Sequence, residues 1–122
     1  MNYYVLIKSK GEHGWIGVDW DGTIVEHPKG DFKEFTPIPR MVSRVKRWLD
    51  QGRDVRILTA RVSPESFGKK KIKKQKKLIQ KACEKYFGYK LPVTAEKDHL
   101  MIALYDDRAH HVEKDTGRVV EE

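Results

Sequence analysis

The sequence predicts an α/β domain, a Rossmann-like three-layer α/β/α sandwich around a mainly parallel sheet. Short apolar runs end in polar residues at Asp19, Thr59 and Asp106, as strands do where they reach the edge of a sheet. Longer segments with helical periodicity separate these runs. A strand, a helix and a second strand in this order form a right-handed parallel crossover.

Length and composition predict a single soluble domain that spans residues 1–122. With 39% hydrophobic and 35% charged residues, the chain is large enough to bury one core. No apolar run is long enough to cross a bilayer, so no membrane partner is expected. The N-terminus lacks the pattern of a signal peptide, and the lone Cys83 has no partner for an internal disulfide. We therefore expect the protein in a reducing cytoplasm.

In the first half of the chain, aromatic and β-branched residues predict a strand over residues 3–8. A turn that contains His13 leads into a second strand, which starts at Trp15. A loop over residues 24–36 precedes a helix that begins near Thr36 and Pro37 and carries one apolar stripe. Gly52 suits the C-terminal cap of this helix.

In the second half, residues 54–59 predict a strand and residues 63–87 a long helix. Ser63 fits the N-cap and Pro64 the first helical position, with a break near Gly68 left open. Short strands are expected at residues 93–95 and 100–105. Residues 110–113 and 118–121 resemble the two arms of a terminal hairpin.

Asp19 and Asp21 follow the second strand and stand one residue apart. Side chains alternate along a strand, so both carboxylates point the same way if the chain stays extended. Gly22 lets the backbone bend at this point. Two adjacent acids repel each other unless a cation or a shared proton compensates. The alternative is an ordinary solvated Asp-Gly turn.

The order of four motifs resembles the haloacid dehalogenase superfamily of phosphohydrolases. These motifs are Asp-Trp-Asp-Gly-Thr at residues 19–23, a strand that ends at Thr59, Lys97, and a strand that ends at Asp106 and Asp107. The resemblance extends from about Trp15 to Val112, and the segment from Lys97 to Ala109 also looks like small phage and bacterial members. It implies a phosphoric monoester hydrolase.

This resemblance also implies roles for single residues. Asp19 resembles the nucleophile that becomes an aspartyl-phosphate. Asp21 resembles the general acid that protonates the leaving oxygen and then activates water. Thr59 would donate a hydrogen bond to a phosphoryl oxygen, and Lys97 would neutralise charge. The alternatives are a strand-end hydroxyl for Thr59 and a surface ion pair for Lys97.

The carboxylates also predict a Mg²⁺ site, because hard oxygen ligands suit this ion. The chain offers no cysteine–histidine cluster, which disfavours zinc. The resemblance implies Asp19, the backbone carbonyl of Asp21, and Asp106 as ligands. It implies that Asp107 binds through water or orients the site, with the reverse order of Asp106 and Asp107 as the alternative.

The spacing of the motifs leaves no room for a sizeable cap domain, because only a short loop follows Thr23. An open site favours a large substrate, such as a nucleic-acid end or a phosphoprotein. The expected substrate contacts are Gly22, Thr23, Arg61, Arg108, Lys69, Lys70, Lys73 and Lys74.

The net charge of +7 has one local source, the seven lysines of residues 69–77. The other 18 basic residues balance 18 acidic ones. This run is either a contact surface for nucleic acid or a solvated helix face. The sequence therefore predicts a Mg²⁺-dependent phosphatase that acts on nucleotides or polynucleotide ends. The alternatives are a nucleic-acid-binding module without catalysis and a small-molecule nucleotidase.

Overall fold

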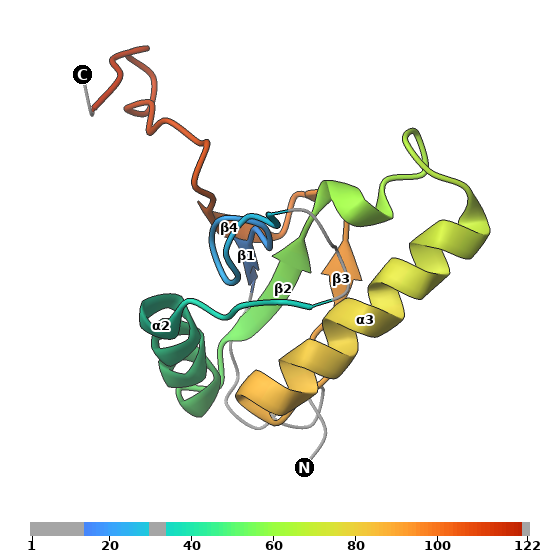
Figure 1. The fold of residues 1–122 in the computed structure, drawn as a ribbon. Helices are drawn as coiled ribbons and strands as arrows, with labels where there is room; N and C mark the ends of the chain where they lie inside the picture. The colour runs from blue at the N-terminus through green and yellow to red at the C-terminus, as the bar shows by residue number, and fades with distance from the viewer. Residues whose placement is uncertain (1–13, 30–33, 121–122) are drawn as a thin grey trace.

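The computed structural model describes residues 14–29 and 34–120. The strand predicted at residues 3–8 and the turn residue His13 lie outside these ranges. Two helices and four strands follow one another in the described part (Figure 1), together with the short 3₁₀ helix η1. Their bounds are β1 Trp15–Val18, α2 Pro39–Asp50, β2 Asp54–Leu58, η1 Ala60–Val62, α3 Lys69–Phe87, β3 Val93–Thr94 and β4 Met101–Tyr105.

All four strands run parallel in one sheet, in the order β3-β2-β1-β4. This confirms the predicted α/β class and the parallel sheet. β1 lies between β2 and β4, and all four of its residues are buried, as expected for a strand covered on both sides. Val18 pairs with Ile57 of β2 and with Tyr105 of β4. The three strands therefore end at nearly the same level.

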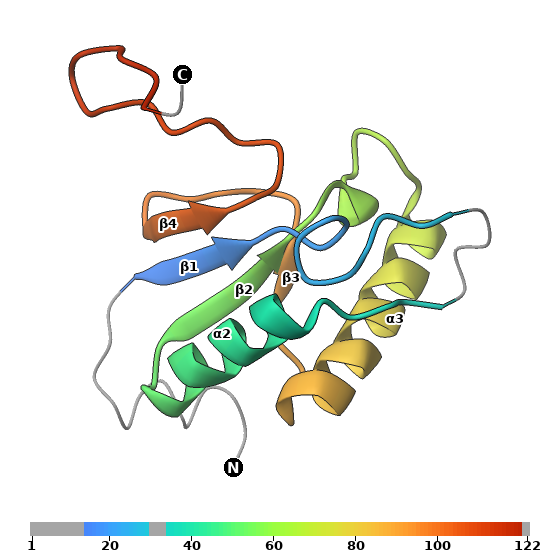
Figure 2. The ribbon, with the colours of Figure 1, turned by 60° about the vertical axis from the view of Figure 1, so that its left-hand side comes forward.

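Both helices pack on one face of the sheet (Figure 2). The connections from β1 to β2 and from β2 to β3 step in the same direction, and right-handed crossovers in one direction place their helices on the same face. Ile16 and Val18 of β1 form one core with Leu49 of α2 and Ile79 of α3. The described residues thus give two layers where the sequence predicts three.

The opposite face of the sheet is crossed by residues 95–100, which connect β3 to β4 and are too few for a helix of typical length. Trp15, which alternates with the core residue Ile16, donates a hydrogen bond from Nε1 to Asp98 Oδ1 at 2.8 Å. This bond, with a second from the Leu100 amide, lowers the pKa of Asp98. The Arg56 guanidinium lies 5.0 Å from the Trp15 ring centroid on the same face.

Both predicted C-terminal ends of the helices hold, whereas both helices begin later than predicted. α2 begins at Pro39 instead of near Thr36 and Pro37, and it is followed by Gly52, whose φ of +76° lets the chain turn as predicted. Gly88 likewise ends α3 in the left-handed conformation. The prediction that Ser63 starts the long helix is wrong. Its carbonyl accepts the amides of Ser66 and Phe67 in a separate turn, and α3 begins only after the extended Gly68.

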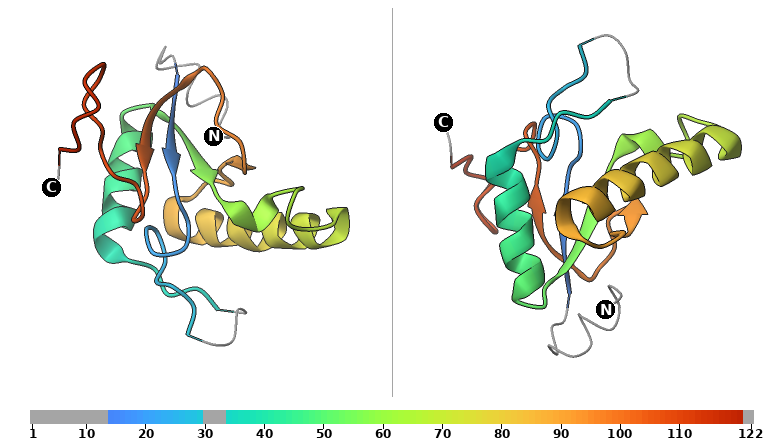
Figure 3. Two further views of the ribbon diagram at one scale, coloured as in Figure 1. Left: turned by 90° about the horizontal axis from the view of Figure 1, so that it is seen from above. Right: turned by 60° about the horizontal axis from the view of Figure 1, so that its bottom comes forward.

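Residues beyond β4 lead away from the sheet (Figure 3). Val112 and Val119 form an antiparallel bridge there, and Glu113 pairs with Arg118. This agrees with the predicted terminal hairpin. The described residues form no cap domain, and none of their helices combines the length and the apolar character that crossing a membrane requires.

Candidate active site

Between β1 and β4 the order of strands in the sheet switches, because the connections from β1 lead to β2 and β3 on one side and β4 is added on the other. The chain leaves β1 toward the helix-covered face, whereas β4 is reached across the opposite face. Adjacent parallel strands whose connections diverge in this way leave a crevice that serves as a ligand site in open α/β sheets. Asp19 and Asp106 directly follow these two strands, and the Asp19 amide donates to the Tyr105 carbonyl at 2.9 Å.

Three carboxylates meet in this crevice, and we call Asp19, Asp106 and Asp107 the acidic triad. Each contributes an oxygen atom, and the three oxygens lie within 4.8 Å of one another. Burial raises the pKa of Asp19 to about 7, and the neighbouring carboxylates of Asp107 and Asp106 add to this shift. An oxygen-only group of this kind is the donor set that Mg²⁺ prefers. The triad therefore brings together three of the four predicted metal ligands.

Asp107 is held in place by two residues of the loop that follows β1. The nearly buried Thr23 accepts a hydrogen bond from the Asp107 amide at 3.2 Å and donates its hydroxyl to Asp107 Oδ1 at 3.3 Å. His27 Nε2 lies 3.2 Å from Asp107 Oδ2. Desolvation raises the pKa of Asp107, but hydrogen bonds with His27, with Asp19, with its own backbone amide and with Thr23 outweigh it and lower the pKa overall.

Gly22 allows this arrangement because it has no side chain. Its φ is +83°, and a Cβ atom there would lie 2.5 Å from His27 Nε2 and 2.6 Å from Asp107 Oδ2. Both observations disfavour an L-residue at this position, because its backbone would be strained and its Cβ atom would displace His27 and Asp107. Neither Gly22 nor Thr23 lines the cavity described below, and their role as substrate contacts stays a prediction.

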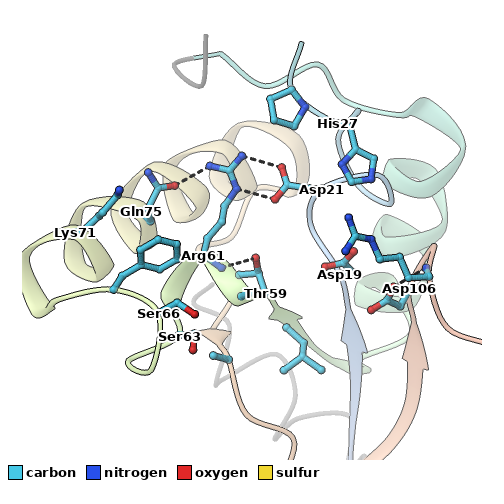
Figure 4. A pocket seen from close by; sticks show the side chains of 16 residues that line it. Asp19, Asp21, His27, Thr59, Arg61, Ser63, Ser66, Lys71, Gln75 and Asp106 are labelled. Carbon is cyan, nitrogen blue, oxygen red and sulfur yellow. Dashed lines mark hydrogen bonds and ion pairs between the residues drawn. The ribbon is translucent and has the colours of Figure 1, made fainter. Parts of the chain in front are cut away.

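Asp21 points away from the acidic triad, toward Arg61 (Figure 4). Arg61 donates to both carboxylate oxygens of Asp21, at 2.7 and 2.8 Å, and to Gln75 Oε1 at 2.9 Å. Such paired contacts from one guanidinium are strong and fix its orientation. Thr59 is buried and accepts the Arg61 amide at 3.2 Å. The predicted catalytic pair Asp19 and Asp21 thus shares one site while the two carboxylates face different partners.

A cavity of about 870 Å³ lies between the Asp21–Arg61 pair and the carboxylates of Asp19 and Asp106. The end of the sheet forms one side of it, and the segment that leads into α3 forms the other (Figure 4). The residues on the first side include Asp19, Asp21, Thr59, Arg61, Asp106 and Arg108. Those on the second side include Ser63, Ser66, Phe67, Lys71 and Gln75.

Five predicted site lysines do not line this cavity, namely Lys69, Lys70, Lys73, Lys74 and Lys97. Lys97 is exposed and follows Ala95, which does line it, by two residues, so its role stays a prediction. The sequence reasoning missed His27 as a support of Asp107. The sequence indicated this role of His27 only by placing a histidine in the loop that follows the strand ending at Asp19.

Taken together, the site places two carboxylates of the acidic triad, Asp19 and Asp106, around one open cavity with the paired Arg61 and the buried hydroxyl of Thr59. Groups of this kind bind a divalent cation and a phosphoryl group. No match was found when the chain was compared with protein-family models, with curated proteins or with solved structures.

Proposed function

We propose that this protein is a Mg²⁺-dependent phosphatase that hydrolyses phosphate monoesters through an aspartyl-phosphate at Asp19. The observation that carries the proposal is the convergence of Asp19, Asp106 and Asp107 where the sheet connections diverge, with oxygens within 4.8 Å of one another. The motif order, which resembles the haloacid dehalogenase superfamily, supports the same activity. The proposal includes the Rossmann-like three-layer sandwich that this resemblance implies.

The acidic triad would hold the magnesium ion, with Asp106 as a direct ligand. A bound divalent cation supplies charge neutralisation for a phosphoryl group and relieves repulsion among the carboxylates. Thr23 and His27 fix the orientation of Asp107. The Asp107 carboxylate would therefore hold the magnesium ion in place even if it contacts the ion through a water molecule.

In the proposed reaction, a carboxylate oxygen of Asp19 attacks phosphorus and the bond to the ester oxygen breaks. The leaving oxygen takes a proton from Asp21. Water then attacks the phosphoryl group, Asp21 accepts a proton from that water, and inorganic phosphate leaves with Asp19 restored. Thr59 would donate its hydroxyl to a phosphoryl oxygen, and Lys97 would neutralise charge.

The pair between Arg61 and Asp21 adds a step to this sequence. Both oxygens of Asp21 accept from the guanidinium, so the pair must open before Asp21 donates a proton. A phosphoryl group in the cavity competes for the same guanidinium donors. Substrate binding would thereby release Asp21 for its role as general acid.

The test is phosphate release from an aryl phosphate with Mg²⁺, for the wild type and Asp19→Asn. Asp115→Asn is the matched control, because Asp115 is exposed on the C-terminal turn. We expect release to fall to the uncatalysed rate in Asp19→Asn and to stay unchanged in the control. Undiminished turnover in Asp19→Asn would overturn the assignment.

A second candidate function is nucleic-acid binding without catalysis. It is favoured by α3, whose 19 residues include nine lysines and one glutamate. This function predicts salt-dependent binding of an oligonucleotide that survives Asp19→Asn, without phosphate release from any substrate.

A further inference from the structure

The charge of α3 is distributed in a way that its packing does not require. Ile79, Cys83 and Phe87 bury one side of the helix. All seven lysines of residues 69–77 are exposed. Lys70, Lys74 and Lys77 follow each other at helical spacings of four and three residues, so they lie along one exposed strip. We call these three residues the lysine strip.

Helix stability does not explain where these lysines lie. Lys69, Lys70 and Lys71 occupy the first turn, which contains no acidic residue, and Gly68 offers no side-chain cap. The N-terminal end of a helix carries partial positive charge and therefore disfavours cations. Like charges three or four residues apart also repel each other. A bound polyanion would offset both costs.

The same end of α3 borders the candidate active site. Lys71 and Gln75, one turn apart, line the cavity that also contains Asp19 and Asp106. Phe67 lines it as well, with Lys71 Nζ 5.0 Å from its ring centroid. In Figure 4 Lys71 and Gln75 lie across the cavity from Asp19. The cationic surface thus starts at the cavity and continues outward along the helix.

Resting on the proposed phosphatase function, we infer that the substrate is a single-stranded nucleic acid with a terminal phosphate. The terminal phosphate would occupy the cavity beside the acidic triad, and the following phosphodiesters would contact the lysine strip. Neighbouring positions on the strip are about 5–6 Å apart. The strip therefore offers several cations in a row, which can contact successive phosphates of a polymer, whereas a small metabolite would need only one. The Phe67 ring offers a stacking surface for a base, which favours nucleic acid over a phosphoprotein.

The inference can be tested with two triple variants that each remove three positive charges. The first changes the lysine strip, as Lys70→Gln, Lys74→Gln and Lys77→Gln. The matched control changes the exposed residues of α2, as Arg40→Gln, Arg44→Gln and Lys46→Gln, none of which lines the cavity. The substrates are single-stranded oligonucleotides with a 5′- or a 3′-phosphate, a mononucleotide and an aryl phosphate.

We expect the wild type to prefer one of the phosphorylated oligonucleotides, with a kcat/KM that falls as salt rises. Each phosphate contact of a single strand contributes about 0.7 to the slope of log affinity against log salt, so loss of the strip should make the slope shallower by about 2. Between 50 and 200 mM salt, this difference amounts to about 20-fold in kcat/KM. Hydrolysis of the aryl phosphate should stay unchanged in both variants.

The contrary outcomes separate this inference from the proposed function. Aryl phosphate hydrolysis without a preference for oligonucleotides, or oligonucleotide turnover that does not change when the lysine strip is replaced, would overturn the inference alone. Equal losses in both triple variants would do the same. A higher kcat/KM for a phosphorylated acidic peptide, with the same lysine dependence, would replace nucleic acid by phosphoprotein. Failure to hydrolyse any substrate would overturn the phosphatase itself.

Discussion

Asp19→Asn should stabilise the metal-free protein at alkaline pH while it abolishes hydrolysis. Asp19 lies within a cluster of carboxylates, and burial and these neighbours raise its pKa from 3.8 to about 7. The folded state therefore opposes ionisation of this residue. Asparagine has nearly the same shape and carries no charge, so it removes this cost.

The sign and size of the effect follow from the two pKa values. The unfolded chain ionises Asp19 near pH 3.8 and the folded protein near pH 7, so folding takes up a proton between these values. The free energy of unfolding therefore falls as pH rises through this window, and the loss is complete above it. The full shift corresponds to about 4 kcal/mol. Because Asp19 is only partly buried, solvent screening reduces the expected difference to about 1–2 kcal/mol.

The assay is denaturant unfolding at pH 5 and pH 8 with a chelator present, for the wild type, Asp19→Asn and the control Asp115→Asn. The wild type should lose stability relative to Asp19→Asn between the two pH values, whereas Asp115→Asn should follow the wild type. Mg²⁺ at about 100 times its dissociation constant should then stabilise the wild type by about 2.7 kcal/mol and Asp19→Asn much less.

Two results would refute this reasoning. One is an equal stability difference between wild type and Asp19→Asn at both pH values, because the charge of Asp19 would then carry no cost in the folded state. The other is equal stabilisation of both proteins by Mg²⁺, which would place the ion away from the acidic triad.

Three further predictions concern residues around the same core and site. Gly22→Ala should destabilise the protein by about 1–3 kcal/mol and weaken Mg²⁺ binding. The control Gly117→Ala shares the positive φ but its Cβ atom meets no atom within 4 Å, so it should cost less stability and leave Mg²⁺ binding intact. Equal effects of the two substitutions would contradict a steric requirement for glycine at position 22. Burial raises the pKa of Cys83 to about 12, so a thiol reagent at pH 8 should label Cys83 only as the protein unfolds. Rapid labelling of the folded protein would contradict the burial of Cys83 between α3 and the sheet. Arg61→Lys loses the paired contact with Asp21 and should lower kcat/KM for an aryl phosphate about 10-fold or more; unchanged kinetics would remove Arg61 from the site.

The strand ends could be predicted from sequence because each apolar run stops at a polar residue. Asp19 and Asp106 meet as expected, since Val18 pairs directly with Tyr105. Parallel pairing of neighbouring strands brings their carboxyl ends to one edge, and this property does not depend on details of the loops.

Other features depend on contacts that the local sequence does not encode. Ser63 and Pro64 match a helix start, but the turn they form closes on itself and Gly68 delays α3 to Lys69. The local sequence also does not show where the cavity lies around α3, so Lys71, which lines it, was not among the predicted contacts. The pairing of Asp21 with Arg61 likewise depends on how the segment after β2 turns toward α3.

The late position of β4 in the sequence affects when the site can form during protein synthesis. Asp107 contacts Thr23 across 84 residues of sequence, and β4 comes after both helices and the other three described strands. A nascent chain that has released β1, α2, β2 and α3 from the ribosome can therefore bury most of its core while the acidic triad still lacks two members. Because such distant pairings close the longest loops, this step is also expected to be the slow one in refolding. Activity should accordingly return later than helical structure.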